Sequence, residues 1–143
     1  MADSAPPFAP PFALGGFDHI VLRSADPARL VRFYREVLGC TIAHEQPKIG
    51  LTHLRAGSQL IDIVDAHGAL AQPGDEPLRQ SARNLDHFCL TVQPFDEAAI
   101  RAHLARFGIA PDIAEDRYGA FGTGTSIYIT DPDGNGIELK GRR

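Results

Sequence analysis

Short runs of alternating apolar and polar residues predict β-strands along this chain, and two longer stretches with apolar residues at helical spacing predict α-helices. The first strand is expected over residues 17–23, and the Ser-Ala-Asp-Pro sequence that follows is typical of a helix N-terminus. From Asp26 to Leu38, apolar residues recur three and four positions apart, and Gly39 ends this predicted helix. Three short strands then complete a βαβββ unit, over residues 40–45, 51–55 and 60–65.

The same order of elements returns in the second half of the chain. A strand expected over residues 84–92 precedes a helix expected over 96–107, and Gly108 follows this helix as Gly39 follows the first one. The remaining strands are expected over residues 110–114, 126–130 and 136–140.

Internal duplication explains this repetition. His19 and His87 occupy matching places in the first strand of each half, and Asp62 and Glu138 occupy matching places in the last strand, at a nearly constant distance along the chain. We therefore expect an α+β fold of two βαβββ modules, which form a cupped eight-stranded mixed sheet with the helices on its outer face. Because one module alone leaves an open sheet, two modules must pair within or between chains to enclose a cavity.

A chain of 143 residues is long enough to bury the core of one domain. Its predicted parts are a flexible Pro/Ala-rich arm over 1–16 and a single domain over 17–143, which is divided into module 1 (17–65), a linker (66–83) and module 2 (84–140).

Composition narrows the classes of partner. The chain is 43% apolar and 22% charged, as ordinary globular proteins are. A net charge of −4 provides no basic stripe for nucleic acid. Cys40 and Cys89 form no C-x-x-C pair, so a reducing, cytoplasmic location is the simplest expectation. Residues 1–16 have neither a basic start nor a continuous apolar run, and we therefore expect no signal peptide and no membrane contact.

Three side chains are candidate metal ligands. Side chains alternate between the faces of a strand, so Glu138 is expected on the face opposite Ile137 and Leu139, where His19 and His87 can join it. A single strand histidine is more often packed or solvated, but two at duplicated positions together with a carboxylate favour a metal. These ligands suit zinc, nickel, manganese, cobalt or iron, and they leave positions open for substrate or water.

For the other titratable residues, the sequence allows more than one role. Asp62 has three interpretations: a fourth ligand, an unligated general base beside the metal, or a carboxylate at the sheet rim that is solvated or paired with an arginine. His44 and His53 have no duplicated partner, and His67 and His103 are expected at the surface.

Four motifs resemble the vicinal-oxygen-chelate superfamily, which contains glyoxalases, bleomycin-resistance proteins and dioxygenases, over about residues 17 to 140. They are Asp18-His19-Ile20-Val21-Leu22, Phe33-Tyr34 with Leu38-Gly39, Leu85-Asp86-His87, and Asp131-Pro132-Asp133-Gly134-Asn135-Gly136-Ile137-Glu138-Leu139. The resemblance implies a cupped eight-stranded site, often shared across a dimer, with His19, His87 and Glu138 as ligands. Asp62 stands where glyoxalase I relatives carry a glutamate ligand. The chain also resembles the glyoxalase-domain-containing-5-like proteins.

A further resemblance, to the fosfomycin-resistance branch, lies in residues 124–128. It implies that Ser126 and Tyr128 contact the substrate, helped by Arg117. The loop over 117–124, however, lacks the dense basic cluster that a phosphonate favours. Its glycines also suit a flap or a hairpin with a solvated Arg117.

The sequence thus predicts a homodimeric enzyme that depends on a divalent metal and acts as a lyase or isomerase on a small, oxygen-rich substrate. One alternative is a metal-free protein of the bleomycin-resistance kind that sequesters a ligand. Others are a fosfomycin-resistance-like transferase or hydrolase and an extradiol-type dioxygenase.

Overall fold

A computed structural model describes residues 17–71, 85 and 87–142. The predicted arm over 1–16 and the predicted linker from residue 72 onward lie outside the described residues.

Module 1 is a four-stranded mixed sheet with one helix. The strand order is β1-β4-β3-β2, with β1 parallel to β4 and the other neighbours antiparallel. Asp26 caps the N-terminus of the helix because its side chain accepts a hydrogen bond from the Arg29 amide. The elements are β1 His19–Ser24, α1 Pro27–Glu36, β2 Thr41–Gln46, a short 3₁₀ turn Pro47–Ile49, β3 Leu51–Ala56 and β4 Gln59–Asp65.

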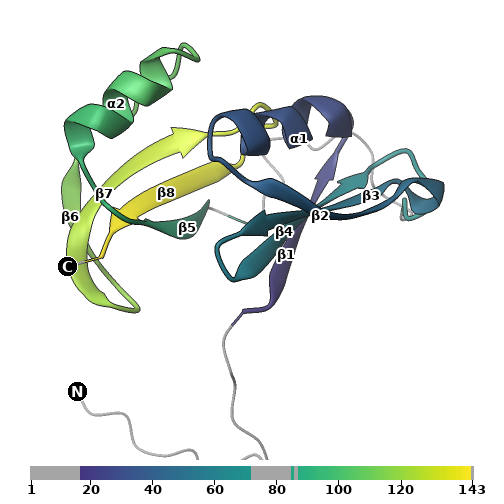
Figure 1. The fold of residues 1–143 in the computed structure, drawn as a ribbon, viewed down its shortest axis with the longest axis horizontal. Helices are drawn as coiled ribbons and strands as arrows, with labels where there is room; N and C mark the ends of the chain where they lie inside the picture. Colours follow the sequence, from purple (N-terminus) through teal and green to yellow (C-terminus); the bar gives the residue numbers. More distant parts are fainter. Residues whose placement is uncertain (1–16, 72–84, 86, 143) are drawn as a thin grey trace, which may run out of the picture.

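Module 2 repeats this topology in the order β5-β8-β7-β6, again with its first and last strands parallel. The residues that follow the two helices, Gly39 and Gly108, both have positive φ, at 74° and 71°. The α+β class and the two-module architecture are confirmed, and the eight strands form two four-stranded sheets (Figure 1). The elements are β5 His87–Val92, α2 Glu97–Ala105, β6 Glu115–Gly119, β7 Gly122–Thr130 and β8 Gly136–Gly141.

The strand predicted over 110–114 is wrong, because β6 begins only at Glu115. The guanidinium of Arg101 donates to the backbone oxygens of Pro111 and Asp112 at 3.0 and 2.7 Å, which ties this segment to α2 instead of to the sheet. β7 also starts at Gly122, four residues before the predicted start, so the glycine-rich loop is the tip of a β6–β7 hairpin.

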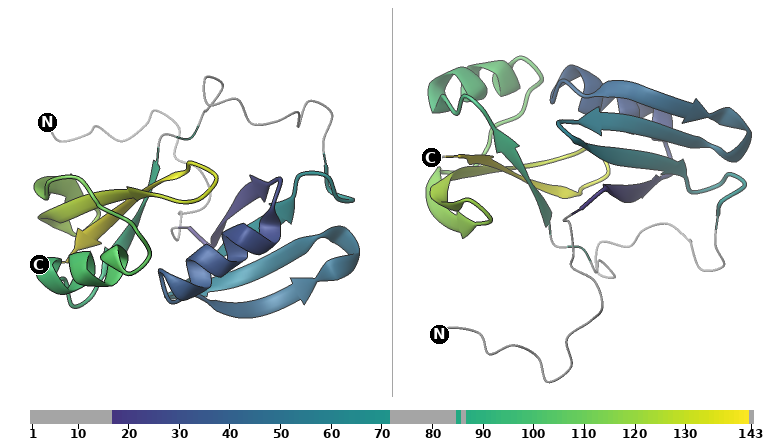
Figure 2. Two further views of the ribbon diagram at one scale, coloured as in Figure 1. Left: turned by 90° about the horizontal axis from the view of Figure 1, so that it is seen from above. Right: turned by 60° about the horizontal axis from the view of Figure 1, so that its bottom comes forward.

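Each helix covers one face of its sheet and leaves the other face open (Figures 1 and 2). On the covered side of module 1, Leu30 and Tyr34 of α1 and Ile63 of β4 are fully buried. On the opposite face, Val21 is 53% exposed. This open face is the one predicted to carry His19. None of the described helices is long and apolar enough to cross a lipid bilayer.

The two modules are joined by hydrogen bonds between α1 and the turn after β7. Tyr34 donates its hydroxyl to Asp131 Oδ2 at 2.7 Å, and both residues are buried. Arg29 reaches the same turn and donates to Asp133 Oδ1 at 3.0 Å. From the other helix, His103 Nε2 lies 2.8 Å from the backbone oxygen of Val37. The modules therefore hold a fixed relative position through a buried polar link.

Candidate functional site

His19 and Asp62 form a pair on the open face of module 1. β1 and β4 are parallel neighbours, and their register places Val21 beside Asp62. His19 lies two residues before Val21 on the same face, with its Nε2 3.9 Å from Asp62 Oδ2. On the other side of the ring, Nδ1 donates to Asp18 Oδ1 at 2.6 Å, and this hydrogen bond raises the pKa of His19. The hydrogen bond to Asp18 therefore leaves Nε2 as the ring nitrogen that faces Asp62.

Asp62 is only 3% exposed and has a second imidazole beside it. His53 of β3 is its direct cross-strand partner, and His53 Nδ1 lies 2.8 Å from Asp62 Oδ1. Oδ1 nevertheless makes no hydrogen bond with any residue that the structure describes. A buried carboxylate oxygen in this condition is costly unless positive charge lies nearby.

The equivalent pair in module 2 is His87 and Glu138. His87 Nε2 lies 3.2 Å from Glu138 Oε2, and the fully buried Ser126 donates its hydroxyl to Glu138 Oε1 at 2.6 Å. Tyr128 packs edge-on against the His87 ring, with 5.5 Å between ring centroids. Burial and the nearby Glu138 raise the pKa of the Cys89 thiol to about 11, so this neighbour stays protonated at neutral pH.

We call each of these pairs a half-site: half-site 1 is His19 with Asp62, and half-site 2 is His87 with Glu138. His19 of half-site 1 and both residues of half-site 2 line one open groove of about 1380 Å³. Within residues 17–71, 85 and 87–142, however, no group of three His, Cys, Asp or Glu side chains converges closely enough to hold an ion. The structure therefore brings together two of the three predicted ligands, His87 and Glu138, and places His19 with Asp62.

The predicted substrate contacts have different surroundings. Arg117 lies on the exposed β6 strand and forms an ion pair with Glu115, as a solvated rim residue does. The Ser126 hydroxyl donates its hydrogen bond to Glu138, so its direct contact with a substrate stays a prediction. Tyr128 is partly exposed beside His87, where a small molecule can reach it.

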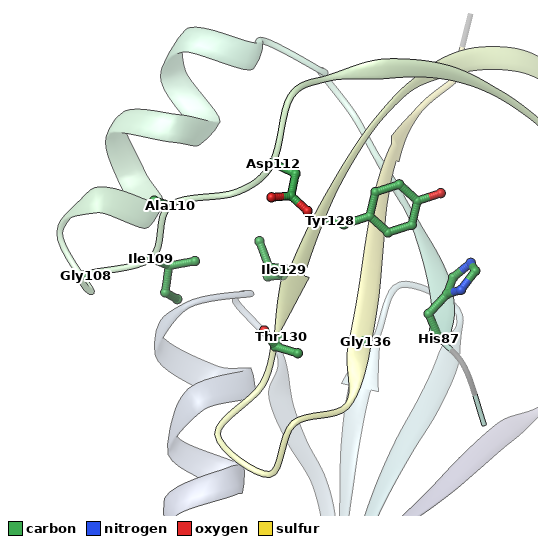
Figure 3. A pocket seen from close by; sticks show the side chains of 9 residues that line it. All are labelled: His87, Gly108, Ile109, Ala110, Asp112, Tyr128, Ile129, Thr130 and Gly136. Atoms are coloured by element: carbon green, nitrogen blue, oxygen red, sulfur yellow. The ribbon is translucent and has the colours of Figure 1, made fainter. Parts of the chain in front are cut away.

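A smaller cavity of about 710 Å³ lies next to half-site 2 (Figure 3). His87 and Tyr128 line one side of it, and Asp112 and Ile109 from the connection between α2 and β6 line another. The cavity thus offers room for a small molecule in contact with a predicted ligand.

Sequence reasoning missed the role of His53. Gly57 and Ser58 form a two-residue hairpin turn, which pairs Ala56 with Gln59 and therefore His53 with Asp62. The turn length and the alternation of side chains could have revealed this contact, because a two-residue turn fixes the register of the strands that it joins. The duplicated pattern does not indicate the contact between His53 and Asp62, because His53 has no histidine counterpart in module 2.

Comparison with known proteins supports the two-module interpretation. Residues 16–139 match the model of the Glyoxalase/Bleomycin resistance protein/Dioxygenase superfamily. This chain belongs to that superfamily. The superfamily prediction is confirmed, and the narrower resemblance to glyoxalase-domain-containing-5-like proteins stays a prediction.

Individual relatives show what this superfamily member is similar to. Virulence protein STM3117 of Salmonella typhimurium is 33% identical over 123 residues, which cover 85% of this chain and 81% of the relative. An integron cassette protein from the mobile metagenome of V. cholerae is 28% identical with a TM-score of 0.74, over 92% of this chain and 98% of that one. Lactoylglutathione lyase from Agrobacterium tumefaciens shares the fold, at 23% identity and a TM-score of 0.63, over 90% and 94% of the two chains.

The donor set of this superfamily member fits a divalent cation. Each half-site supplies one imidazole nitrogen and one carboxylate oxygen, the donors that first-row metals accept. Asp18 behind His19 and Ser126 behind Glu138 occupy the outer positions that usually orient metal ligands. The buried Asp62 Oδ1 without a hydrogen bond is a further feature that positive charge would stabilise.

Proposed function

We propose that this chain is the subunit of a homodimeric enzyme that depends on a divalent metal and acts as a lyase or isomerase on a small, oxygen-rich molecule. The observation that carries this proposal is the pair of half-sites, each with a histidine Nε2 directed at a carboxylate and a hydrogen bond behind one member of the pair. His19, His87 and Glu138 would hold the ion. When bound, the ion would supply a Lewis acid that polarises a substrate oxygen.

The protein's own residues have defined tasks in this proposal. Asp62 Oδ2 faces His19 and is the atom that would accept a proton from the substrate. Tyr128 would line the substrate site beside His87. Arg117 would reach the substrate from β6 after its ion pair with Glu115 breaks. Ser126 would hold Glu138 in one orientation.

A second copy of the chain would complete the metal centre. The polar link between α1 and the turn after β7 would hold the two modules of one chain in place, which favours a partner chain as the source of the second half-site. Apolar side chains that line the same groove are exposed in the single chain: Phe17 is 84% exposed, Phe121 54% and Leu85 45%. Exposed apolar groups of this size are typical of an interface. A twofold dimer would place half-site 1 of one protomer against half-site 2 of its partner, twice.

The test of activity is a substrate screen on protein loaded separately with zinc, nickel, manganese, cobalt or iron. The screen contains aldehydes with thiols, epoxides, 2-oxo acids and catechols. These compounds represent the reaction classes that the sequence leaves open. Turnover that disappears on chelation and returns with metal supports the proposal. Turnover that persists after complete metal removal contradicts it. Oxygen uptake with catechols would identify the dioxygenase alternative.

The apolar lining of the groove favours one rival, a protein that sequesters an apolar or aromatic ligand without turnover. This rival predicts that ligand binding survives chelation and that His19→Ala leaves the affinity unchanged. Calorimetric titration of metal-free protein and of the variant, with ligands that emerge from the same screen, separates the two functions.

A further inference from the structure

Asp62 has a supporting chain of side chains that extends to the edge of module 1. Gln46 of β2, whose register partner is Leu51, reaches diagonally to His53 of β3, and His53 lies directly opposite Asp62 of β4. Gln46 Nε2 is 3.0 Å from His53 Nε2, and His53 Nδ1 is 2.8 Å from Asp62 Oδ1. Three neighbouring strands thus each contribute one side chain to a row that ends at half-site 1.

The direction of the contacts fixes the tautomer of His53. The amide nitrogen of Gln46 is a donor only, so His53 Nε2 must accept and the neutral ring must carry its proton on Nδ1. That N–H lies next to Asp62 Oδ1, the buried oxygen that makes no hydrogen bond with any described residue. The 2.8 Å between the two atoms is within the range of hydrogen-bond distances. The other oxygen, Oδ2, remains directed at His19.

Module 2 has no such arrangement among its described residues. There the direct cross-strand partner of Glu138 is Tyr128, and the carboxylate makes hydrogen bonds with Ser126, two residues before Tyr128 on β7, and with His87. Duplication therefore accounts for the two half-sites but not for His53 and Gln46. Their row is particular to the module with the shorter carboxylate, Asp62.

We propose that His53, oriented by Gln46, is a positioning residue that holds Asp62 through Oδ1 and thereby presents the single oxygen Oδ2 to the cation site beside His19. This inference rests on the proposed metal-dependent function. Whether Asp62 contacts the ion or a water bound to it, its negative charge favours cation binding only while it stays oriented.

The first test needs no metal. Nitrogen-15 NMR of the histidine rings in the metal-free protein should show His53 protonated on Nδ1 and unprotonated on Nε2. Gln46→Leu should weaken this tautomer preference, because only Asp62 Oδ1 then favours the proton on Nδ1. A wild-type His53 ring that is protonated on Nε2 would overturn the inference, because Gln46 could not then orient it as described.

The second test is titration of the metal-free protein with Co²⁺, followed by its visible d–d absorption. His53→Leu should weaken Co²⁺ binding about 10- to 100-fold, the usual effect of removing an outer-shell partner, and should change the shape of the absorption bands. His53→Asn should restore much of the affinity, since its amide nitrogen can donate from the position of Nδ1. His44→Leu is the matched control, because it removes the imidazole that lies opposite His53 and stacks on it at 5.7 Å, while Gln46 and Asp62 keep their contacts with His53.

The outcomes separate this inference from the proposed function. If the wild type binds no Co²⁺, both fail. If the wild type binds Co²⁺ and His53→Leu has the same affinity and spectrum, only the inference fails, as it does if His53→Asn is no better than His53→Leu. Should His53→Leu fail to fold, Gln46→Leu decides the question, and an unchanged Co²⁺ affinity and spectrum in that variant would overturn the inference.

Discussion

Tyr34→Phe should lower the free energy of unfolding by removing the buried link between the modules. The substitution keeps the ring, which is fully buried in α1, and deletes only the hydroxyl that donates to Asp131 at 2.7 Å. A hydrogen bond to a charged group contributes about 1.5 to 3 kcal/mol.

The environment of Asp131 narrows this range. Oδ2 keeps a second donor, the side-chain amide of Asn135 at 2.8 Å, and Oδ1 keeps the backbone amides of Asp133 and Asn135, each at 2.9 Å. The carboxylate is therefore not left unpaired in the variant. We expect a loss of about 1.5 to 2 kcal/mol, at the lower end of the range for charge-assisted hydrogen bonds.

Urea-induced unfolding, followed by circular dichroism, measures this loss as a lower midpoint with an unchanged slope. Tyr118→Phe is the matched control, since it deletes the same hydroxyl from a side chain that is 87% exposed, and it should change stability by less than about 0.5 kcal/mol. If Tyr34→Phe is as stable as Tyr118→Phe, the hydrogen bond to Asp131 does not hold the modules together.

Three other predictions follow from single features of the fold. Burial raises the pKa of Tyr34 and of the Cys40 thiol, so the folded chain retains protons that the unfolded chain loses above the ordinary values of 10.0 and 9.0. The contribution of these two groups to the free energy of unfolding should therefore be fully present below about pH 9 and should fall as pH rises to about 11. Urea midpoints measured across that range will show this loss. Gly124→Ala would place a Cβ 2.2 Å from a backbone oxygen of β8, and thermal melting should show a loss of more than about 2 kcal/mol, whereas the exposed Thr123→Ala should melt like the wild type. Ser126→Ala removes the hydrogen bond that orients Glu138, and calorimetry should show metal affinity reduced by about 10-fold or more. Unchanged affinity would show that Ser126 does not support metal binding.

The duplicated pattern in the sequence was enough to predict most of the fold and the residues of both half-sites. Helix spacing and the terminal glycines located α1 and α2, and strand alternation assigned His19 and Glu138 to the faces opposite the helices. These are local properties of the chain, so they can be recognised without knowing which elements meet.

Contacts between residues far apart in the chain are harder to predict from the sequence. The strand predicted over 110–114 failed because Arg101, on the preceding helix, binds the backbone of that segment. Asp131, which begins the Asp-Pro-Asp-Gly motif, accepts a hydrogen bond from Tyr34, and no local pattern in the sequence predicts this contact. His53 acts through its register with Asp62 and not through any motif.

In the proposed dimer, two half-sites from different protomers hold one divalent ion, and metal analysis of protein purified without chelator shows whether they do. Wild-type protein should contain about one ion per chain, and His19→Ala and His87→Ala should each contain almost none. When the two variants are mixed and allowed to exchange subunits, each mixed dimer should regain one intact site, so the mixture should bind about a quarter of the wild-type amount. Equal, negligible metal in all samples would contradict the metal centre. Metal in the wild type without recovery in the exchanged mixture would contradict the shared site.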